Sequence, residues 1–245
     1  MKNSAHISVI KYDSSDPRLG RHVEHDERSW NFRFLDKNIK PRLITTHWTS
    51  KAAPLNQGDV GSCTGNALTQ WLNTDFAGAV QVARNAGKLF DEQDALNIYS
   101  KATILDNISG QYPPTDTGST GNAACKAGVK FGYLKSYSWL FSFTSLQAAI
   151  EMTPLITGTL WTKTMFKPVN GLVSVGSLAN SNVAGGHEYL MSGIDYKAEV
   201  FEFRNSWGDT KDWPGCKPGG YFAIGFKDYR RLIDSSGDVT VPKIS

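Results

Sequence analysis

The chain before residue 140 carries apolar residues at helical spacing. After Asn66, apolar side chains recur every four positions with an indole beside them, at Leu68, Trp71, Leu72 and Phe76. This stripe predicts a helix that buries one face, and residues 91–105 show similar spacing. A third helix is expected over residues 122–131, because Gly132 is a typical residue to end it. We therefore expect a helical first half.

Beyond residue 140 the pattern changes to short apolar or alternating runs bounded by Gly, Asp and Pro, which is typical of strands. A short helix is expected at 145–152. Four strands are then expected, at 154–161, 188–194, 200–204 and 220–226. Helices followed by strands, rather than alternating with them, predict an α+β fold with two lobes. We see no internal repeat and no low-complexity segment.

The first 45 residues are polar and broken by Pro and Gly. Trp30, Phe32 and Phe34 stand at alternate positions, which predicts a short extended segment that docks on the body. His22 and His25 are three residues apart beside two acidic residues, but a third ligand at zinc spacing is missing. We therefore interpret them as surface polar residues and expect no metal site.

Composition is that of an ordinary globular protein and removes several function classes. The length of 245 residues is enough for one large domain or two small ones. Of these residues, 40% are hydrophobic and 20% are charged. The net charge of +3 is scattered, with Tyr229-Arg230-Arg231 as the densest basic run, so nothing favours a nucleic-acid partner. No stretch approaches the ~18 apolar residues of a membrane span, and we see no signal-peptide core. We expect no membrane association and favour a cytoplasmic location.

Cysteine is scarce. Cys63, Cys125 and Cys216 are too few for a disulfide framework in a chain of this length. If Cys63 is a free thiol, only a bridge between Cys125 and Cys216 stays open. The low count favours a reduced, intracellular protein.

Cys63 stands between a tight Gly61-Ser62 turn and a predicted helix. The unpaired N–H groups and partial positive charge of a helix N-terminus stabilise a thiolate, which is the nucleophilic form of cysteine. On this stretch alone, a catalytic cysteine and a small buried structural one are equally good interpretations.

Two later junctions also carry candidate chemistry. His187 follows two glycines at the expected start of a strand, where a substrate or a second backbone can come close. Asn205 ends another strand beside Trp207, so its amide can accept the ring N–H of a histidine while the indole covers the contact. Taken singly, His187 fits a core histidine with satisfied hydrogen bonds, and Asn205 fits an ordinary exit from a strand.

Together these stretches resemble the papain-like cysteine peptidases. The matching motifs are Gln57-Gly58-x-x-Gly61-Ser62-Cys63, Gly186-His187, Asn205-Ser206-Trp207-Gly208 and Gly219-Gly220-Tyr221-Phe222. Their order is that of the family, and His187 and Asn205 follow Cys63 by 124 and 142 residues. These separations are close to the family's roughly 130–150. The resemblance covers about residues 43–228.

The resemblance implies a two-lobed fold with the active-site cleft between the lobes. Residues 43–140 would form a helical left lobe and residues 141–228 an antiparallel, β-barrel-like right lobe. Residues 1–42 would be an N-terminal extension or strap, and residues 229–245 a C-terminal tail.

The resemblance also implies catalytic roles. Cys63 would attack as a thiolate, paired with an imidazolium at His187 that later protonates the leaving amine. Asn205 would orient His187, and Trp207 would shield that contact. The Gln57 side-chain amide and the Cys63 N–H would form the oxyanion hole. A thiolate–imidazolium pair requires a lowered cysteine pKa and a raised histidine pKa.

Specificity is where the sequence departs from the family pattern. Val60 replaces the usual second cysteine and Thr64 the usual aromatic, and the form Gly-Ser-Cys-Thr-x-Asn-Ala looks like the bacterial and phage branch. The loop with Gly118, Ser119 and Thr120 resembles the edge that pairs with extended substrate, and Gly186 and Trp207 are further candidate contacts. Glu188 occupies a position that is usually small and near the pocket for the second residue before the cut. We hypothesise that it favours a basic or polar side chain.

The expected partner is a polypeptide substrate in extended conformation, bound by a monomer without a cofactor. Residues 1–42 are too short to be the family's large helical propeptide. They either lie over the cleft and limit access or only stabilise the body. The alternative function is a catalytically silent member of the fold that serves as a binding or structural module. The presence of all four catalytic residue types argues against it.

Overall fold

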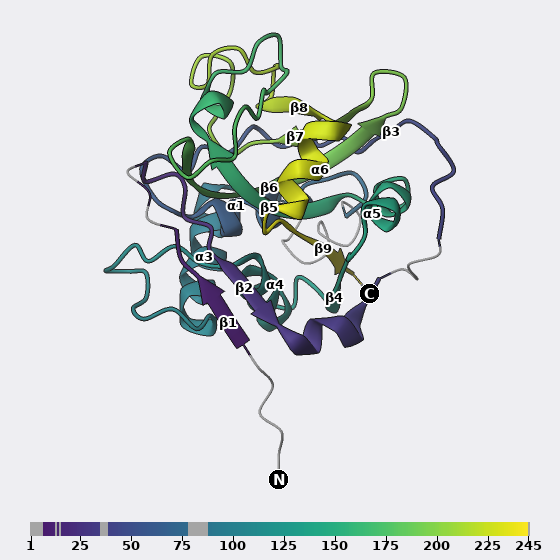
Figure 1. Cartoon of the computed structure of the whole chain (residues 1–245). Helices are drawn as coiled ribbons and strands as arrows, with labels where there is room; N and C mark the ends of the chain where they lie inside the picture. The colour runs from purple at the N-terminus through teal and green to yellow at the C-terminus, as the bar shows by residue number, and fades with distance from the viewer. Residues whose placement is uncertain (1–6, 13, 15, 35–38, 78–87, 245) are drawn as a thin grey trace.

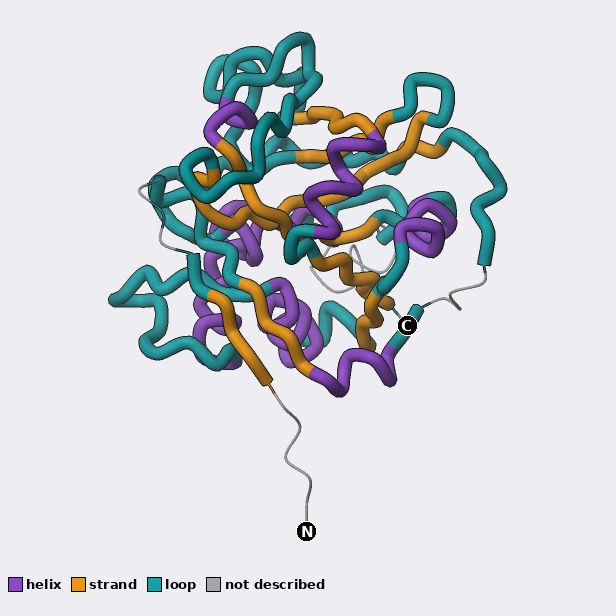
Figure 2. Tube along the Cα trace, viewed as in Figure 1, coloured by secondary structure: helices purple, strands orange, loops and turns teal. Residues whose placement is uncertain are grey.

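The computed structural model describes residues 7–12, 14, 16–34, 39–77 and 88–244 (Figure 1). One group of helices lies apart from the large antiparallel sheet, and other helices lie against that sheet, as the colours of Figure 2 show. The expected α+β class is therefore confirmed. The buried apolar residues form two clusters, one that joins the helices to Ile156 and Leu190 of the sheet and one around the sheet itself.

The helical lobe is built from α1 (Cys63–Leu72), α3 (Glu92–Leu105) and α4 (Gly121–Lys130). Asp91 begins α3 by accepting hydrogen bonds from the backbone N–H groups of Gln93 and Asp94, as an N-cap residue does. These helices surround the fully buried side chains of Trp71 and Ile98. Burial of a large apolar side chain stabilises the fold by about 1.5–3 kcal/mol.

Helix α1 begins and ends earlier than the apolar stripe predicts. It starts at Cys63, and Asn73 follows its last residue. The Asn73 side chain exchanges two hydrogen bonds with the backbone of Phe90, of 2.8 and 3.0 Å, which draws the chain away from the helix axis. Phe76 thus lies outside the helix and is 38% exposed, so its place in the buried stripe is wrong.

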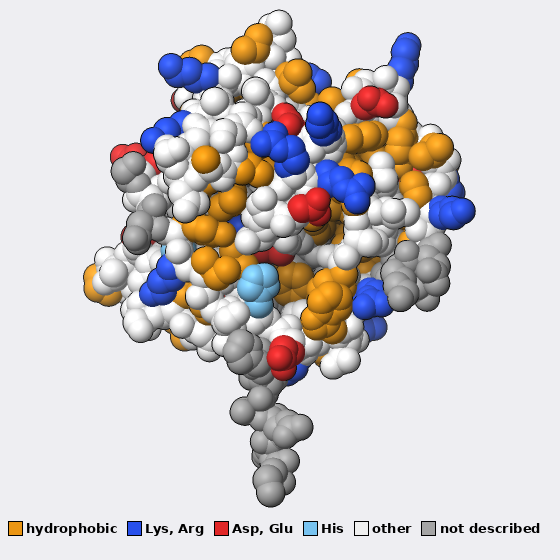
Figure 3. Space-filling model, viewed as in Figure 1, with side chains coloured by type: hydrophobic (Ala, Val, Ile, Leu, Met, Phe, Trp, Pro, Cys, Tyr) orange, Lys and Arg blue, Asp and Glu red, His pale blue; other side chains and the backbone are white. Residues whose placement is uncertain are grey.

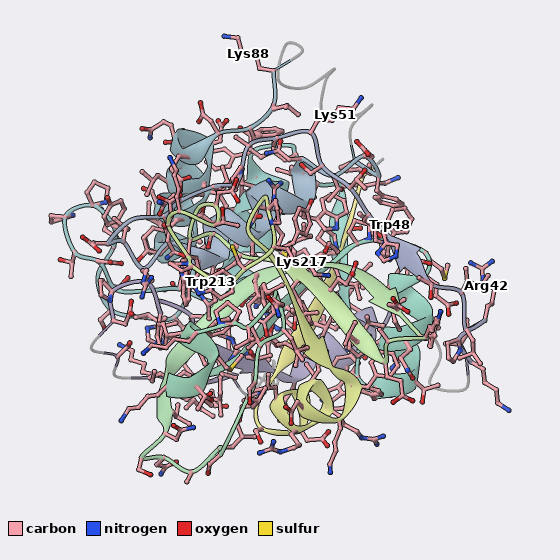
Figure 4. The ribbon with its side chains drawn as sticks, turned by 90° about the horizontal axis from the view of Figure 1, so that it is seen from above. Arg42, Trp48, Lys51, Lys88, Trp213 and Lys217 are labelled. Carbon is pink, nitrogen blue, oxygen red and sulfur yellow. The ribbon has the colours of Figure 1, made fainter. Side chains whose placement is uncertain are left out.

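The second lobe is an antiparallel sheet whose strand order is β4-β9-β5-β6-β7-β8, with β3 paired to β6. The strands are β3 (Thr46–His47), β4 (Ser136–Trp139), β5 (Leu155–Thr162), β6 (Val183–Asp195), β7 (Val200–Arg204), β8 (Tyr221–Gly225) and β9 (Asp238–Lys243). Two helices, α5 (Phe143–Ile150) and α6 (Phe226–Asp234), accompany it, and η2 (Lys163–Phe166) follows β5. Trp48, the residue after β3, donates a hydrogen bond to the carbonyl of Ile150, the last residue of α5; Trp48 is labelled in Figure 4.

The sheet does not close into a barrel. Within the described residues its path ends at β4 and β8, whose only named strand partners are β9 and β7, so the barrel-like expectation is corrected to an open sheet. Strand β9 lies between β4 and β5. Residues 229–245, set apart above as a tail, thus contribute most of α6 and a strand inside the sheet.

Strand β6 is longer than predicted. It begins at Val183, and Gly185 and Gly186 pair with Trp161 and Leu160 of β5. His187 therefore lies inside the strand rather than at its start. The two glycines interrupt the apolar pattern without interrupting the backbone pairing, which is why the sequence pattern places the start of the strand too late.

The N-terminal part forms β1 (Ile7–Ile10) and β2 (Val23–Asp26), which pair antiparallel, followed by the 3₁₀ helix η1 (Glu27–Phe32). Asp26 begins η1 by accepting a hydrogen bond from Arg28 N–H. The extended segment predicted from alternate aromatics is therefore wrong. Trp30 lies on the 3₁₀ helix, is 58% exposed, and stacks on Phe141 at 4.2 Å between ring centroids.

The surface agrees with the scattered charge of the sequence. On the face shown in Figure 3, Lys and Arg side chains are distributed singly or in small groups over several elements. Among the described residues, the longest apolar helices are too short to span a lipid bilayer.

Candidate active site

Cys63 is the first residue of α1 and is fully buried. The preceding turn is held by two backbone hydrogen bonds, Val60 N to Gln57 O and Ser62 N to Val60 O. Asp116 fixes the same turn from the helical lobe by accepting a hydrogen bond of 2.7 Å from Gly61 N. The sulfur therefore stands at a rigid helix N-terminus.

His187 and Asn205 meet across the sheet. Nε2 of His187 lies 2.7 Å from Oδ1 of Asn205, and both side chains are fully buried. The antiparallel pairing of β6 with β7 places the end of β7 opposite the middle of β6, and Asn205 N donates to the carbonyl of Gly220. This contact assigns the Nε2 proton to the bond with Asn205 and leaves Nδ1 for another partner.

An aromatic group encloses this pair. The ring of Trp207 lies 4.8 Å from that of His187 and is tilted by 31°, while the ring of Trp161 lies 5.0 Å away on edge. Trp213, labelled in Figure 4, lies 5.3 Å from Trp207 and donates its indole N–H to the carbonyl of Phe166. The His187–Asn205 bond is therefore shielded from water, as expected for Trp207.

Gln57 is held beside the same contact. Its Nε2 donates to the carbonyls of Val60 at 2.8 Å and of Arg18 at 3.1 Å. Its Oε1 accepts 2.7 Å from the hydroxyl of Ser206, the residue after Asn205. With the oxygen occupied by Ser206, one amide N–H is directed to Val60 O in the same turn and the other to Arg18 O.

Residues 16–22, which we call the covering segment, lie across this site. Gly20 pairs with Gly186 and Arg21 with Ser119, in both cases as parallel bridges. Three backbone hydrogen bonds hold the segment: Arg21 N to Gly186 O at 3.2 Å, Ser119 N to Gly20 O at 2.8 Å, and His22 N to Ser119 O at 2.8 Å. The segment thus occupies the groove between the loop of the helical lobe and strand β6.

The covering segment fits closely against the nucleophile's turn. A Cβ at Gly20 would lie 2.0 Å from the carbonyl oxygen of Gly61, so only glycine fits there. Leu19 is 3% exposed and belongs to the core of the sheet lobe. The guanidinium of Arg18 lies 4.3 Å from the centroid of the Trp207 ring, within the range of a cation–π contact.

Neither a scan against protein-family models nor a search of curated proteins found a match. Among solved structures, the chain is similar to xylellain, a cysteine protease from Xylella fastidiosa, with a TM-score of 0.71 and 17% identity over 96% of this chain and 99% of that one. It is also similar to digestive procathepsin L 3 of Tenebrio molitor (TM-score 0.61, 17% identity, 96% and 84% covered). A procathepsin L2 proteinase from the same larval midgut gives a TM-score of 0.55 at 16% identity, with 86% and 70% covered. The chain has a papain-like protease fold.

In this papain-like fold the pKa values of the candidate pair are displaced in the direction opposite to that of an ion pair. Burial raises the pKa of the Cys63 thiol to about 12, although the N–H groups of Glu188 and Gly20 oppose this. Burial lowers the pKa of His187 to about 4, although the hydrogen bond that its ring N–H donates to Asn205 opposes this. With the segment in place, the expected thiolate–imidazolium pair is corrected to a neutral thiol and a neutral imidazole, since desolvation disfavours both charges.

Most of the candidate substrate contacts lie against the covering segment. Ser119 and Gly186 pair with the covering segment, and a Cβ at Gly118 would lie 2.4 Å from Gly20 O. Thr120 serves another purpose, because its hydroxyl caps α4 by accepting from Ala123 N. Glu188 is fully buried and forms an ion pair of 3.7 Å with Arg21.

The other two cysteines are free and buried, and Cys125 lies 3.7 Å from the hydroxyl of Thr240. The bridge between Cys125 and Cys216 is therefore absent. Among the described residues, no group of three or more His, Cys, Asp or Glu side chains is arranged to hold a metal ion. His22 is buried rather than at the surface, and its Nε2 lies 2.9 Å from the carbonyl of Thr117.

Sequence reasoning missed three residues of the site. Ser206 positions Gln57, and its only signal is its place between Asn205 and Trp207. Arg21 and Asp238 lie in the polar N-terminal stretch and in the expected tail, where hydrophobic periodicity carries no information about tertiary contacts.

Proposed function

We propose that this protein is a papain-like cysteine peptidase that hydrolyses peptide bonds at Cys63. The observation that carries the proposal is the buried His187–Asn205 bond of 2.7 Å, on the strand that reaches the Cys63 thiol. A histidine fixed through Nε2 keeps Nδ1 for proton transfer with a nucleophile. We further propose, from the form Gly-Ser-Cys-Thr-x-Asn-Ala, a place in the bacterial and phage branch.

The proposed reaction proceeds through a thioester. Once substrate replaces the covering segment, proton transfer from Cys63 to Nδ1 of His187 gives the thiolate, which attacks the peptide carbonyl carbon. The Gln57 amide and the Cys63 N–H bind the resulting oxyanion. His187 then protonates the amine as the C–N bond breaks. Water, deprotonated by His187, attacks the thioester and releases the acid and the Cys63 thiol.

We propose that the covering segment keeps this site latent. Arg18 O already accepts from Gln57 Nε2, and Gly20 and Arg21 already pair with Ser119 and Gly186. A peptide substrate requires the same donors, acceptors and groove. Removal of the segment therefore has to precede or accompany substrate binding. Ser119 and Gly186 would then pair with the substrate backbone.

The test uses a papain-directed epoxide and mass spectrometry on the full-length chain. A Leu19→Asp variant places a charge where the segment needs burial, and Ile104→Asp adds the same charge on α3, where Ile104 is 53% exposed. We expect one equivalent of label on Cys63 in Leu19→Asp, slow labelling in wild type and Ile104→Asp, and none in Leu19→Asp/Cys63→Ala. A folded Leu19→Asp chain without label would favour a catalytically silent module.

A further inference from the structure

One carboxylate joins the turn before Cys63 to the loop before Ser119. Oδ2 of Asp116 accepts a hydrogen bond of 2.7 Å from the backbone N–H of Gly61, two residues before the nucleophile. A Cβ at Gly61 would lie 2.9 Å from the other oxygen, so the carboxylate packs directly on the turn. Asp116 lies three residues before Ser119, whose N–H donates to Gly20 O of the covering segment at 2.8 Å. A single side chain thus connects the nucleophile's turn to the edge that pairs with the covering segment.

Tyr99 of α3 holds the same carboxylate from the other side. Its hydroxyl donates to Oδ1 of Asp116 and accepts a hydrogen bond of 2.9 Å from the N–H of Gly118. The Tyr99 side chain is fully buried, and burial together with the Asp116 carboxylate raises the pKa of this hydroxyl. The hydroxyl therefore keeps its proton, and each oxygen of Asp116 accepts a hydrogen bond from a different element.

Helices α1 and α3 approach each other closely beside this tyrosine. Gly65 is the third residue of α1, which begins at Cys63. A Cβ at Gly65 would lie 2.3 Å from the carbonyl oxygen of Ala95 and 2.9 Å from Cβ of Tyr99, so only glycine permits this approach. The tyrosine is therefore held against the helix that carries the nucleophile, and its hydroxyl is a fixed point to which residues 116–118 bind.

The position of this edge decides where a bound peptide lies relative to the sulfur. Residues 106–120 connect α3 to α4 and form neither helix nor strand, and such loops are the more mobile parts of a fold. A peptide that pairs with Ser119 is placed at Cys63 only as precisely as this loop is held. A misplacement of about 1 Å can lower a rate about 10²-fold. The proposed reaction therefore requires the loop to be fixed to the nucleophile's turn.

We propose that Asp116 and Tyr99 are positioning residues of the peptidase, whose hydrogen bonds fix the distance between the Ser119 edge, which holds an extended substrate, and the Cys63 turn, which attacks it. This inference rests on the proposed function for its role in turnover. The connection between the turn and the edge is testable without turnover.

The connection is tested by amide hydrogen exchange in the full-length chain, followed residue by residue with NMR. Asp116→Ala and Tyr99→Phe should each raise the exchange rate of the Ser119 N–H at least about tenfold, because the edge can then open locally. Tyr112→Phe is the matched control, since its ring lies 5.3 Å from that of Tyr99 but its hydroxyl takes no part in these bonds. It should leave the rate unchanged. If Asp116→Ala does not fold, Tyr99→Phe carries the test, and an unchanged rate in the variants that fold would overturn the connection.

The turnover test uses the Leu19→Asp chain and compares an extended peptide, which reaches the Ser119 edge, with a single-residue ester, which does not. Asp116→Ala and Tyr99→Phe should each lower kcat/KM at least about tenfold for the peptide and less than about threefold for the ester, because only the peptide is placed by the edge. Asp91→Ala removes the cap of α3 and so lowers stability alone, and it should change neither value. Equal losses on the two substrates would overturn the positioning role.

The proposed function and the positioning role fail in different ways. If neither substrate is turned over and Cys63 takes no epoxide, the proposed peptidase function is wrong, whereas faster exchange at Ser119 would still support the connection between the turn and the edge. If both substrates are turned over and Asp116→Ala lowers both values of kcat/KM equally, the function stands and the positioning role is wrong.

Discussion

The carbonyl oxygen of Arg18 accepts a hydrogen bond of 3.1 Å from the side-chain amide of Gln57. The donor proposed to stabilise an oxyanion is therefore already in contact with a peptide carbonyl of the same chain. The amide is also anchored by Ser206, so its direction does not depend on the occupant. Release of the covering segment would leave a donor in position for a substrate carbonyl.

Thiol reactivity should report the state of the covering segment. With a pKa of about 12, only about one ten-thousandth of the Cys63 thiol is ionised at pH 8, so wild type should react slowly with iodoacetamide, at a rate that rises with pH. In Leu19→Asp, hydration of the pair should permit the thiolate–imidazolium form and give a bell-shaped profile. Alkylation rates of Cys63, followed by mass from pH 4 to 10, check this. Identical profiles in the two proteins would contradict a role of the segment in desolvation.

Acid should destabilise the covered form through His187. Its folded-state pKa of about 4 lies below the ordinary value of 6.5, so the unfolded chain takes up a proton first as pH falls. The stability that the neutral ring provides is thus present above pH 6.5 and lost between 6.5 and 4, by about 3 kcal/mol. Urea unfolding should show that the free energy of unfolding falls less from pH 7 to pH 4.5 in His187→Gln than in wild type. An equal loss in both proteins would show that other groups control acid unfolding.

Removing Asn205 should affect both stability and turnover. Asn205→Ala leaves the buried Nε2 of His187 without its acceptor, which should lower the free energy of unfolding by about 1–3 kcal/mol. In the Leu19→Asp background it should also lower kcat by about 10² or more, because a misoriented base loses its part in proton transfer. Asn122→Ala is the matched control, since Asn122 is a buried asparagine bonded to Glu24 away from the site. It should cost stability without lowering kcat.

The oxyanion donor should act on kcat. Gln57→Ala in the Leu19→Asp background should lower kcat by about 10²–10³, the usual effect of losing one such donor. Gln70 is a second buried glutamine, on α1, and its Nε2 donates to Arg204 O at 3.5 Å. Gln70→Ala should leave kcat within a few-fold of the parent. Steady-state kinetics on a fluorogenic peptide compare the kcat values of Gln57→Ala and Gln70→Ala. Equal losses of kcat would indicate that either substitution disturbs the packing around the site rather than an oxyanion donor.

The packing around the buried Arg21–Glu188 ion pair should tolerate no added methyl group. Gly158→Ala brings Cβ within 2.4 Å of Arg21 and Glu188 and should lower the free energy of unfolding by about 1–3 kcal/mol. Gly225→Ala is the control, because a Cβ there meets nothing within 4 Å and the backbone φ is −61°. It should stay within about 0.5 kcal/mol of wild type. Urea midpoints measure the stability of both variants, and equal values would mean that the side chains around Gly158 shift to make room for the methyl group.

The sequence predicts those elements whose residues share a local period. Helix α3 begins at Glu92 after its Asp91 cap, one residue from the predicted bounds, and β7 has the predicted bounds of 200–204. The Asp91 cap marks the start of α3, and the apolar run marks the length of β7. The N-terminal hairpin and β9 were not predicted, because short partly polar strands are stabilised by pairing partners far away in the sequence.

The order of the motifs identifies the catalytic candidates, but the sequence does not predict the environment in which they lie. Nothing local in Cys63 or His187 indicates that a segment some 45 residues upstream of Cys63 removes water from both, which reverses the expected pKa directions. Glu188 was singled out for its charge, but Arg21 and Asp238 join it only through tertiary structure. Contacts between distant segments carry no periodic signal.

The pairing of Ile10 with Val23 joins the two ends of the stretch that contains the covering segment. The segment is therefore tethered on both sides and competes with any substrate at a high effective concentration, of the order of millimolar for a short linker. A free peptide would have to bind much better than the segment does, or exceed that concentration, to enter the cleft. Opening one end of the β1–β2 pair, or cutting the chain there, would lower this effective concentration. The hairpin at the edge of the molecule thus sets the concentration at which the site responds.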